Sequence, residues 1–561
     1  MVRDIAPASR PFLLSPAQLR RSLHVDAPEL AMARVWRKLE SGQPLRLGLI
    51  GSSVGMSGGC QAEHQPHLRC AQFDGKQTHK FFARGYGIVD DDMKRLLHNS
   101  DRPVRGFALQ VLDALNASFP HLRHTLHNAA VDAWTAKAIE PCVLSNAHIT
   151  TADLLLLELG SQGWHPGQAA ASERIVRKLL TRTGGPPPAL VLATTRQWCT
   201  GGTYGGSVHG LKKKETPKLD VKWEGIEDTF ASFCKAYGVA CLSLRDAIFR
   251  DVLASRPNFT VPDVAADCLH PEQSNFGYHY FADTIIHFLR KSWARYRQRA
   301  PPADAPYAPT PLPPPLLAAN RGSAGRIVWR CYSLDPPAAP QSIAAAPKKA
   351  FGMPACRNGA FNAACTSMPS VRWEAELPGG AAAVADTPSC AELRRCVLGV
   401  ARRREDGACL RGRGHWQFCT HALAPRAPRK PGVVSVLPGA VMRLVVDTTA
   451  PVDANLTTAK LALTYLASYE GMGVCTVSCE GGCACAPRAV DALQMAAPAP
   501  PGGGRGARNV SVASDVEVAV SGAAACVVRL ENTPRRGGSG PALLPAKWKL
   551  LQVRVGWVLV M

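Results

Sequence analysis

Acidic residues are scarce in this chain of 561 residues, which holds 43 Asp and Glu against 65 Lys and Arg and has a formal net charge of +22. Its short basic runs, at 212–214 and 402–404, lack interleaved aromatic residues and any nucleic-acid-binding motif. We therefore expect a solvated basic surface with general affinity for acidic glycans or anionic surfaces, and no nucleic-acid partner.

Long apolar runs are absent as well. No stretch of about 18 apolar residues occurs, so the sequence predicts no transmembrane segment. It also has no phosphate-binding loop and no dinucleotide fingerprint, so no cofactor is expected. The first residues, Met1 to Ala6, lack the charged-then-apolar layout of a secretory signal. We expect either a protein that is not secreted or a true N-terminus that is missing.

Cysteine, in contrast, is plentiful: the chain has 19, and four of them cluster at Cys475, Cys479, Cys483 and Cys485. Clustered cysteines favour disulfides and an oxidising compartment, that is, the secretory pathway or the extracellular space. Buried reduced cysteines in a cytoplasmic protein are the alternative. Zinc is less favoured because the spacing fits no common zinc site and no histidine is near, so no metal is expected. Candidate glycosylation sequons lie at Asn116, Asn258, Asn455 and Asn509.

Apolar runs and helical patterns alternate between about residues 30 and 297. The predicted buried strands are Leu45–Gly51, Leu122–Asn128, Asp153–Leu159, Ala189–Thr194 and Val239–Leu244. The predicted helices include Ala169–Arg182, Gly225–Tyr237 and Glu272–Arg297. This order predicts an α/β fold, a three-layer α/β/α domain with a parallel sheet.

The chain changes character after about residue 300. A proline-rich stretch at 300–316 predicts an extended linker. Beyond it, short β-like runs predict an antiparallel, β-rich and sandwich-like domain; they are Val433–Leu437, Met442–Val446, Leu461–Tyr465, Val516–Val520 and Leu551–Val560. We expect an N-terminal extension at 1–40, the α/β domain at 41–297, a linker at 298–324 and a cysteine-containing β-rich domain at 325–561.

Two short motifs far apart in the sequence suggest an acyl-transfer site. Gly51-Ser52-Ser53 ends a predicted strand, and the turn would present Ser53 at the carboxyl edge of the sheet. The segment Asp267-Cys268-Leu269-His270-Pro271 carries a histidine and a carboxylate on one loop. A histidine can activate a serine hydroxyl by taking its proton. Ser52 and Ser57 are alternative nucleophiles, and a helix-capping Asp267 beside an ordinary polar His270 is the structural alternative.

In this order, the motifs resemble those of the SGNH, or GDSL-type, hydrolase family, in particular the large SGNH-domain proteins of plants and green algae. The resemblance covers about residues 40 to 292. Four blocks carry it: Gly51-Ser52-Ser53-Val54, Asn128-Ala129-Ala130-Val131-Asp132-Ala133, Glu158-Leu159-Gly160-Ser161-Gln162 and Asp267-Cys268-Leu269-His270-Pro271. Ser52 stands where the family has Asp, Ala133 where it has Gly, and Gln162 where it has Asn.

The resemblance implies a role for each of these positions. Ser53 would attack an ester carbonyl, His270 would accept its proton, and Asp267 would orient the imidazole. The oxyanion would be held by the backbone N–H groups of Ser53 and Ala133 and by the side-chain amide of Gln162. A shift of one residue would put Ser161 in place of Gln162. The longer Gln162 side chain moves the donor by about 1 Å, and losing one such donor costs on the order of 3 kcal/mol, which predicts a slow enzyme.

Three functions remain open at this point. The first is a serine esterase or deacylase that removes O-acyl groups, such as acetyl, from a small-molecule ester or an acylated glycan. The second is an O-acyltransferase that uses the same residues with a sugar hydroxyl as acceptor. The third is a non-catalytic binding protein for a carbohydrate or another partner, favoured by the changes at Ala133 and Gln162. Three further histidines, His121, His124 and His127, are interpreted as surface or packing residues.

Overall fold

The computed structural model describes residues 11–26, 29–58, 106–131, 134–161, 163, 167–182, 185–200, 218–265, 269, 271, 276–299, 311–321, 327–332, 372–376, 417–419, 432–436, 438–450, 458–468, 472–493, 512–533 and 547–558. The chain divides into two compact units; the described residues up to Arg321 belong to the first, and those from Ile327 onward to the second. Among the described residues, no helix is long and apolar enough to cross a membrane.

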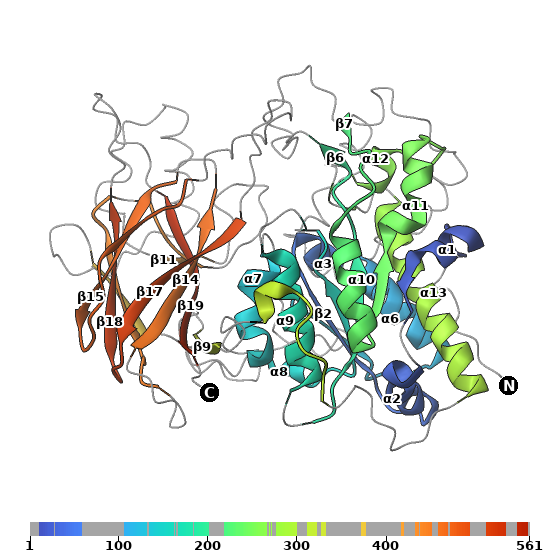
Figure 1. The fold of residues 1–561 in the computed structure, drawn as a ribbon, viewed down its shortest axis with the longest axis horizontal. Coiled ribbons are helices and arrows are strands. Elements are labelled where there is room, and N and C mark those ends of the chain that lie inside the picture. Colours follow the sequence, from blue (N-terminus) through green and yellow to red (C-terminus); the bar gives the residue numbers. More distant parts are fainter. Residues whose placement is uncertain are drawn as a thin grey trace. The chain divides into compact units, whose positions relative to one another are not determined.

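A six-stranded sheet in the order β1-β8-β5-β4-β2-β3 forms the centre of the first unit (Figure 1). Its strands are β1 (Leu23–Val25), β2 (Arg46–Gly51), β3 (Thr125–Asn128), β4 (Leu154–Glu158), β5 (Ala189–Thr194) and β8 (Ala240–Ser243). Strands β3, β2, β4, β5 and β8 pair in parallel, and β1 adds an antiparallel edge. The predicted α/β fold with a parallel sheet is confirmed.

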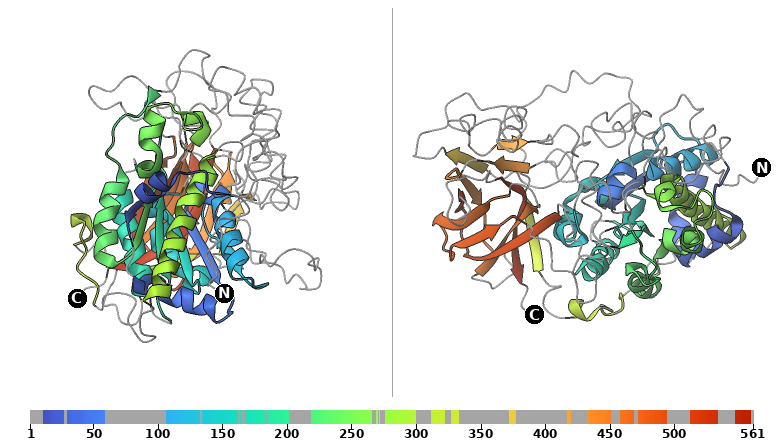
Figure 2. Two further views of the ribbon diagram at one scale, coloured as in Figure 1. Left: turned by 90° about the vertical axis from the view of Figure 1, so that its right-hand side faces the viewer. Right: turned by 90° about the horizontal axis from the view of Figure 1, so that it is seen from above.

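Helices cover both faces of this sheet, as Figures 1 and 2 show. One layer consists of α1 (Pro16–Ser22), α2 (Glu29–Glu40), α6 (Phe107–Ser118), α11 (Leu244–Leu253) and α13 (Gly277–Gln298). The other contains α7 (Ala136–Ile139), α9 (Gln168–Leu180) and α10 (Ile226–Tyr237). Short helices α3 (Ser53–Gly58), α8 (Ala147–Thr150) and α12 (Val261–Val264) connect these elements. The unit is therefore a three-layer α/β/α domain.

Strand β4 shows why the middle strands read as continuous apolar runs. All five of its residues are buried. Leu154 and Leu156 join the core beneath the layer that holds α2, α6 and α13, and successive side chains of a strand point to opposite faces. Leu155 and Leu157 therefore face the other helical layer. A strand covered on both faces needs apolar residues at every position, and this strand has them.

Among the strands of the sheet, the observed bounds differ from the predicted ones chiefly at β3, the edge strand beside β2. Strand β3 begins at Thr125, three residues later than predicted, and Leu122 is fully exposed, so it lies outside the sheet. The antiparallel edge strand β1 was not predicted, because three residues give too short a pattern. Residues Leu14, Leu19 and Trp36 are buried in the core of the first unit, so α1 and α2 are integral to the α/β domain.

The proline-rich segment lies against α9 in its described part, 311–321. The carboxylate of Glu173, on α9, accepts hydrogen bonds from the backbone N–H of Leu316 at 2.6 Å and of Leu317 at 3.2 Å, and from Asn320 Nδ2 at 2.6 Å. Arg177, one turn further along α9, donates to the carbonyl of Pro313 at 2.6 Å. This part of the segment is thus held to α9 by polar contacts, several of them to the buried carboxylate of Glu173.

The second unit contains two antiparallel sheets, one in the order β10-β13-β18-β15-β16 and one in the order β11-β12-β19-β14-β17, with β9 paired to β19. Their bounds are β9 (Ile327–Tyr332), β10 (Arg372–Glu376), β11 (Gln417–Cys419), β12 (Gly432–Ser435), β13 (Val441–Val446), β14 (Thr458–Ala467), β15 (Val474–Gly481), β16 (Arg488–Asp491), β17 (Val512–Ser521), β18 (Cys526–Thr533) and β19 (Trp548–Val558). Residues from both sheets share one core, for example Leu444, Leu463 and Trp548. The predicted β-rich, sandwich-like domain is confirmed.

Disulfides join the cysteine-rich part of this unit. Cys479 pairs with Cys485, and Cys483 pairs with Cys526. The expectation of disulfides in the cluster is confirmed, except that Cys475 is a free, buried thiol whose pKa is raised by burial. Three of the paired sulfur atoms, those of Cys479, Cys483 and Cys526, lie within 4.8 Å of one another. As oxidised sulfurs they cannot act as thiolate ligands for zinc. A further disulfide, Cys234–Cys241, lies in the first unit.

Candidate functional site

The site is organised around the carboxyl end of β2. Gly51 is the last residue of the strand, Ser52 follows it, and Ser53 is the first residue of α3. Both serines are buried, with exposed fractions of 3% for Ser52 and 5% for Ser53. The strand therefore delivers the two serines to the carboxyl edge of the parallel sheet, where open α/β folds bind their ligands. Ser57 lies one helical turn further along α3.

A fully buried carboxylate holds this turn in place. Strand β4 runs parallel to β2 with Gly51 opposite Glu158, and Glu158 is 0% exposed. Its Oε2 atom accepts hydrogen bonds from the backbone N–H of Ser52 at 3.2 Å and of Gly55 at 3.1 Å, and from the Ser52 hydroxyl at 3.2 Å. A side chain at position 51 could not be accommodated, because a Cβ there would lie 2.8 Å from the Glu158 carbonyl oxygen. Glycine is required for this close approach.

The same carboxylate joins the turn of the third sequence block to the serines. Glu158 Oε1 accepts from the backbone N–H of Ser161 at 3.2 Å, and the hydroxyls of Ser52 and Ser161 lie 2.5 Å apart. Burial raises the pKa of Glu158, and the hydrogen bonds from Ser161, Ser52 and Gly55 oppose that shift. Backbone N–H donors stabilise the ionised form of a carboxylate, which can only accept hydrogen bonds. The N–H groups around Glu158 supply such donors.

The second sequence block lies beside the end of β2. The backbone N–H of Ala129 donates to the carbonyl of Leu49 at 2.8 Å, and that of Val131 donates to the carbonyl of Gly51 at 3.0 Å. Asn128, at the end of β3, adds a link to α3, because its Nδ2 donates to the Gly55 carbonyl at 3.3 Å. The chain thus runs alongside the serine turn up to two residues before Ala133. Ala133 itself lies outside the described residues.

The third block forms a tight turn next to the same serines. The backbone N–H of Gly163 donates to the carbonyl of Gly160 at 2.8 Å, and a Cβ at position 160 would lie 2.8 Å from Thr194 Cβ at the end of β5. The turn is thereby packed against the next strand. Ser161 is 1% exposed and its hydroxyl contacts Ser52. Gln162 lies outside the described residues, so the choice between Ser161 and Gln162 as oxyanion donor stays open.

The loop that carries the candidate base is anchored at both ends. Asp267 and His270 lie outside the described residues, whereas Leu269 and Pro271, on either side of His270, are described and buried. Leu269 belongs to the same hydrophobic core as Val54, the residue after Ser53. The backbone N–H of Phe276 donates to the Asp263 carbonyl at 2.8 Å, which links the start of α13 to α12. The roles of Asp267 and His270 remain predictions.

Glu158 is the residue of the site whose role sequence reasoning missed, since it was quoted only as part of a block. One signal could have found it: an acidic residue directly follows four leucines in a strand that is predicted to be buried on both faces. A buried carboxylate requires hydrogen-bond donors, and the neighbouring Gly-Ser-Ser turn supplies backbone N–H groups. The predicted parallel strands Leu45–Gly51 and Asp153–Leu159 have similar lengths, so their ends would place the serine turn beside Glu158.

His124, just before β3, and His127, within it, make packing contacts, whereas the hydrogen bonds of His121 are exposed. His124 accepts a hydrogen bond from the backbone N–H of Leu45 at 2.8 Å through Nδ1, while its Nε2 lies 2.6 Å from the Phe119 carbonyl. His127 stacks on His148, with ring centroids 4.3 Å apart. Burial, together with the neighbouring His148, lowers the pKa of His127 to about 4.

Comparison with known proteins gives a likeness of fold. No protein-family model and no curated protein matches the sequence. Two solved structures of a two-domain esterase active on acetylated mannans are similar to the chain, one of them co-crystallised with mannopentaose. Both are 12% identical; the first has a TM-score of 0.48 and covers 97% of this chain and 99% of its own, and the second has 0.47, 96% and 97%. With TM-scores below 0.5, function must be argued from this chain's own residues.

Proposed function

We propose that the first unit is a serine hydrolase of the SGNH type that cleaves O-acyl esters, with Ser53 as nucleophile. The observation that carries this proposal is the Glu158 carboxylate, which draws the backbone of Ser52, Gly55 and Ser161 together at the carboxyl end of β2. This arrangement fixes the serine turn and the neighbouring turn in one buried hydrogen-bond network. Rigid positioning of this kind is what a nucleophile and its oxyanion donors need.

The proposed reaction uses the residues of all four sequence blocks. The Ser53 Oγ attacks the ester carbonyl carbon while His270, oriented by Asp267, takes the hydroxyl proton. The oxyanion accepts hydrogen bonds from the backbone N–H of Ser53 and Ala133 and from Gln162. His270 returns its proton to the departing alcohol, which leaves an acyl-enzyme on Ser53. Water, activated by His270, then releases the carboxylic acid and restores the serine.

We propose an O-acylated glycan or a small ester as substrate, with acetyl as the acyl group. A glycan would suit a protein from an oxidising compartment, and the disulfides Cys234–Cys241, Cys479–Cys485 and Cys483–Cys526 favour such a compartment. We propose that the second unit serves as a carbohydrate-binding or spacing module.

Hydrolysis of a short-chain nitrophenyl ester and of an acetylated mannan, by the wild-type protein and by Ser53→Ala and His270→Ala, tests the proposal. We expect both substitutions to reduce the rate at least a thousandfold, because they remove the nucleophile and its base. A sugar acceptor added to the same assay separates hydrolysis from acyl transfer, since acylated sugar forms only in transfer. Equal rates in the wild-type protein and both variants would overturn the proposal and favour a binding protein.

A further inference from the structure

A concave site lies at the amino ends of the central strands β2 and β4, away from the serine turn. It is a cavity of about 580 Å³ lined by residues of α2, by the residues before and at the start of β2, by the segment from Thr150 to Asp153 and by the segment after α9. Arg46 begins β2 and Asp153 directly precedes β4, so the cavity lies at the amino ends of these strands. Ser53 lies past the opposite end of β2, which at about 3.3 Å per residue is roughly 20 Å away.

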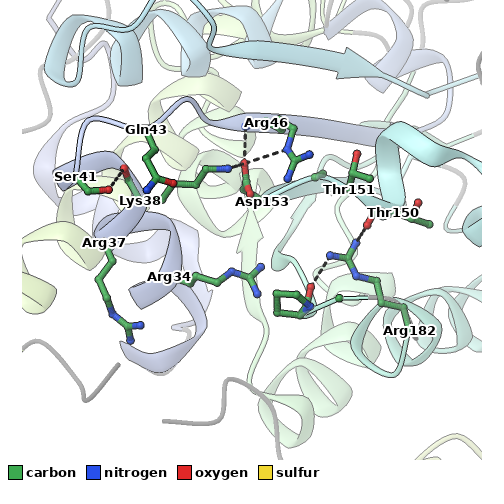
Figure 3. Close-up of a pocket in the computed structure, with 13 residues that line it drawn as sticks. Arg34, Arg37, Lys38, Ser41, Gln43, Arg46, Thr150, Thr151, Asp153 and Arg182 are labelled. Atoms are coloured by element: carbon green, nitrogen blue, oxygen red, sulfur yellow. Dashed lines mark hydrogen bonds and ion pairs between the residues drawn. The ribbon is translucent and has the colours of Figure 1, made fainter. Parts of the chain in front are cut away.

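The lining of this cavity is strongly basic. Five of its residues are Arg or Lys, whereas Asp153 is the one carboxylate among the lining residues that the structure describes. Figure 3 shows Arg37 turned away from the others, which leaves Arg34, Lys38, Arg46 and Arg182 around Asp153. Among the described residues that line the cavity, four cations thus face one carboxylate.

Asp153 is already engaged by two of these cations. Its Oδ2 atom lies 2.7 Å from Lys38 Nζ and 3.6 Å from Arg46 Nε, and it also accepts the backbone N–H of Arg46 at 2.8 Å. Arg182, by contrast, donates to two neutral groups, the backbone carbonyls of Thr150 and Pro186. Burial lowers the pKa of Arg182, and the neighbouring Arg34 and Arg46 lower it further. The positive charge of Arg182 is thus crowded by two neighbouring guanidinium groups.

Neutral carbonyls fix the directions of two guanidinium groups. Arg182 is held by Thr150 and Pro186 from one side, and Arg34 donates to the carbonyl of Pro187 at 2.6 Å. Such anchoring leaves the guanidinium fork ordered before any ligand arrives, which lowers the entropic cost of binding. Because these cations come from three separate segments, they surround the cavity from several directions. That geometry suits a tetrahedral oxyanion better than a planar carboxylate.

We propose that this cavity binds a small molecule that carries a phosphate or sulfate group, with Arg34, Arg46 and Arg182 around the oxyanion. The volume exceeds that of a bare ion and falls in the range of small-molecule sites. The hydroxyl groups of Ser41 and Thr151, which also line the cavity, can bind a polar body such as a sugar. Because the cavity and Ser53 lie at opposite ends of β2, binding here is independent of the proposed hydrolysis.

Isothermal titration calorimetry at fixed ionic strength tests this proposal, with inorganic phosphate as the first probe. A hexose phosphate and a hexose sulfate, titrated separately, distinguish the two sources of a tetrahedral oxyanion. Arg182→Gln removes a central cation, and Arg250→Gln, on the exposed face of α11 and outside the cavity, removes the same charge elsewhere. Arg46→Gln is a second test, because the Arg46 side chain is 53% exposed and its loss should leave the fold intact.

We expect saturable binding by the wild-type protein, weakened about tenfold or more in Arg182→Gln and in Arg46→Gln and less than twofold in Arg250→Gln. Ser53→Ala should bind with unchanged affinity, whatever its hydrolytic activity. Equal weakening by all three arginine substitutions would overturn the proposal, because it would show attraction to the general positive charge of the protein. Heat that never saturates with any of the three probes would overturn it as well.

Discussion

The substitution Glu158→Gln should separate the positioning of the serine turn from the stability of the fold. Glutamine has the shape of glutamate but keeps a single acceptor oxygen. Placed toward Ser52 and Gly55, that oxygen leaves the amide NH2 facing the backbone N–H of Ser161, which Glu158 Oε1 accepts at 3.2 Å. One buried donor then loses its acceptor, which costs about 1–3 kcal/mol of the free energy of unfolding.

The substitution should also lower the rate of catalysis. The N–H groups of Ser52 and Ser161 would move apart, and a displacement of about 1 Å in a positioned nucleophile costs on the order of a hundredfold in rate. Glu173→Gln is a matched control, because Glu173 is also 0% exposed and accepts from Tyr237 Oη at 2.6 Å and from the backbone of Leu316 at 2.6 Å. It holds the proline-rich segment and not the serine turn.

Urea unfolding and ester hydrolysis, measured on the same preparations, test this prediction. We expect both glutamines to lower the free energy of unfolding by similar amounts, and only Glu158→Gln to lower the turnover number about a hundredfold. The reasoning is refuted if Glu158→Gln hydrolyses the ester as fast as Glu173→Gln does, since the carboxylate would then only support the fold.

Three further outcomes are expected. Ser52→Ala loses hydroxyl contacts to Glu158 and Ser161, so it should lower the free energy of unfolding by about 1 kcal/mol and the esterase rate less than tenfold; a complete loss of activity would favour Ser52 as nucleophile. The pKa of His127 is about 4 in the folded state against an ordinary 6.5, so the unfolded chain binds more protons between these values. The free energy of unfolding should therefore rise from pH 4 to 6.5, by less than about 3 kcal/mol after discounting for partial exposure, and His127→Gln should flatten this rise in urea titrations. Replacing Cys234 and Cys241 by alanine opens a loop with a sequence separation of 7 and should cost about 2 kcal/mol of unfolding free energy, whereas intact-mass analysis showing free thiols there would contradict the disulfide.

The sequence predicts the fold of the first unit well, because its strands are buried on both faces and read as uninterrupted apolar runs. Ala189–Thr194 is a strand with the predicted bounds. Strand β1 could not be predicted, since its three residues take their strand geometry from pairing with β8 and not from a pattern of their own. In the second unit, β15 and β18 were not predicted, because polar residues at half-buried positions, such as Thr476 in β15 and Arg529 and Glu531 in β18, interrupt their apolar runs.

In the candidate site, too, local sequence patterns predict some features, whereas others depend on how distant segments pair. The Gly51-Ser52-Ser53 turn follows from a glycine and two serines at the end of a strand, and the structure places it at the expected edge. The partnership of Ser52, Ser161 and Glu158 does not follow from local patterns, because it depends on the register in which β2 pairs with β4. The basic cavity could not be predicted from the sequence either, since its arginines are scattered between positions 34 and 182 and resemble ordinary surface residues.

Covalent labelling with a fluorophosphonate tests the central claim most directly, because such a probe reacts with an activated serine whatever the natural ester is. We predict one adduct per chain by intact mass, mapped to Ser53 by peptide analysis, absent in Ser53→Ala and His270→Ala, and retained in Ser52→Ala. Labelling of Ser53→Ala to the same extent as the wild-type protein, or an adduct on a different serine, would contradict the assignment of Ser53 as the nucleophile.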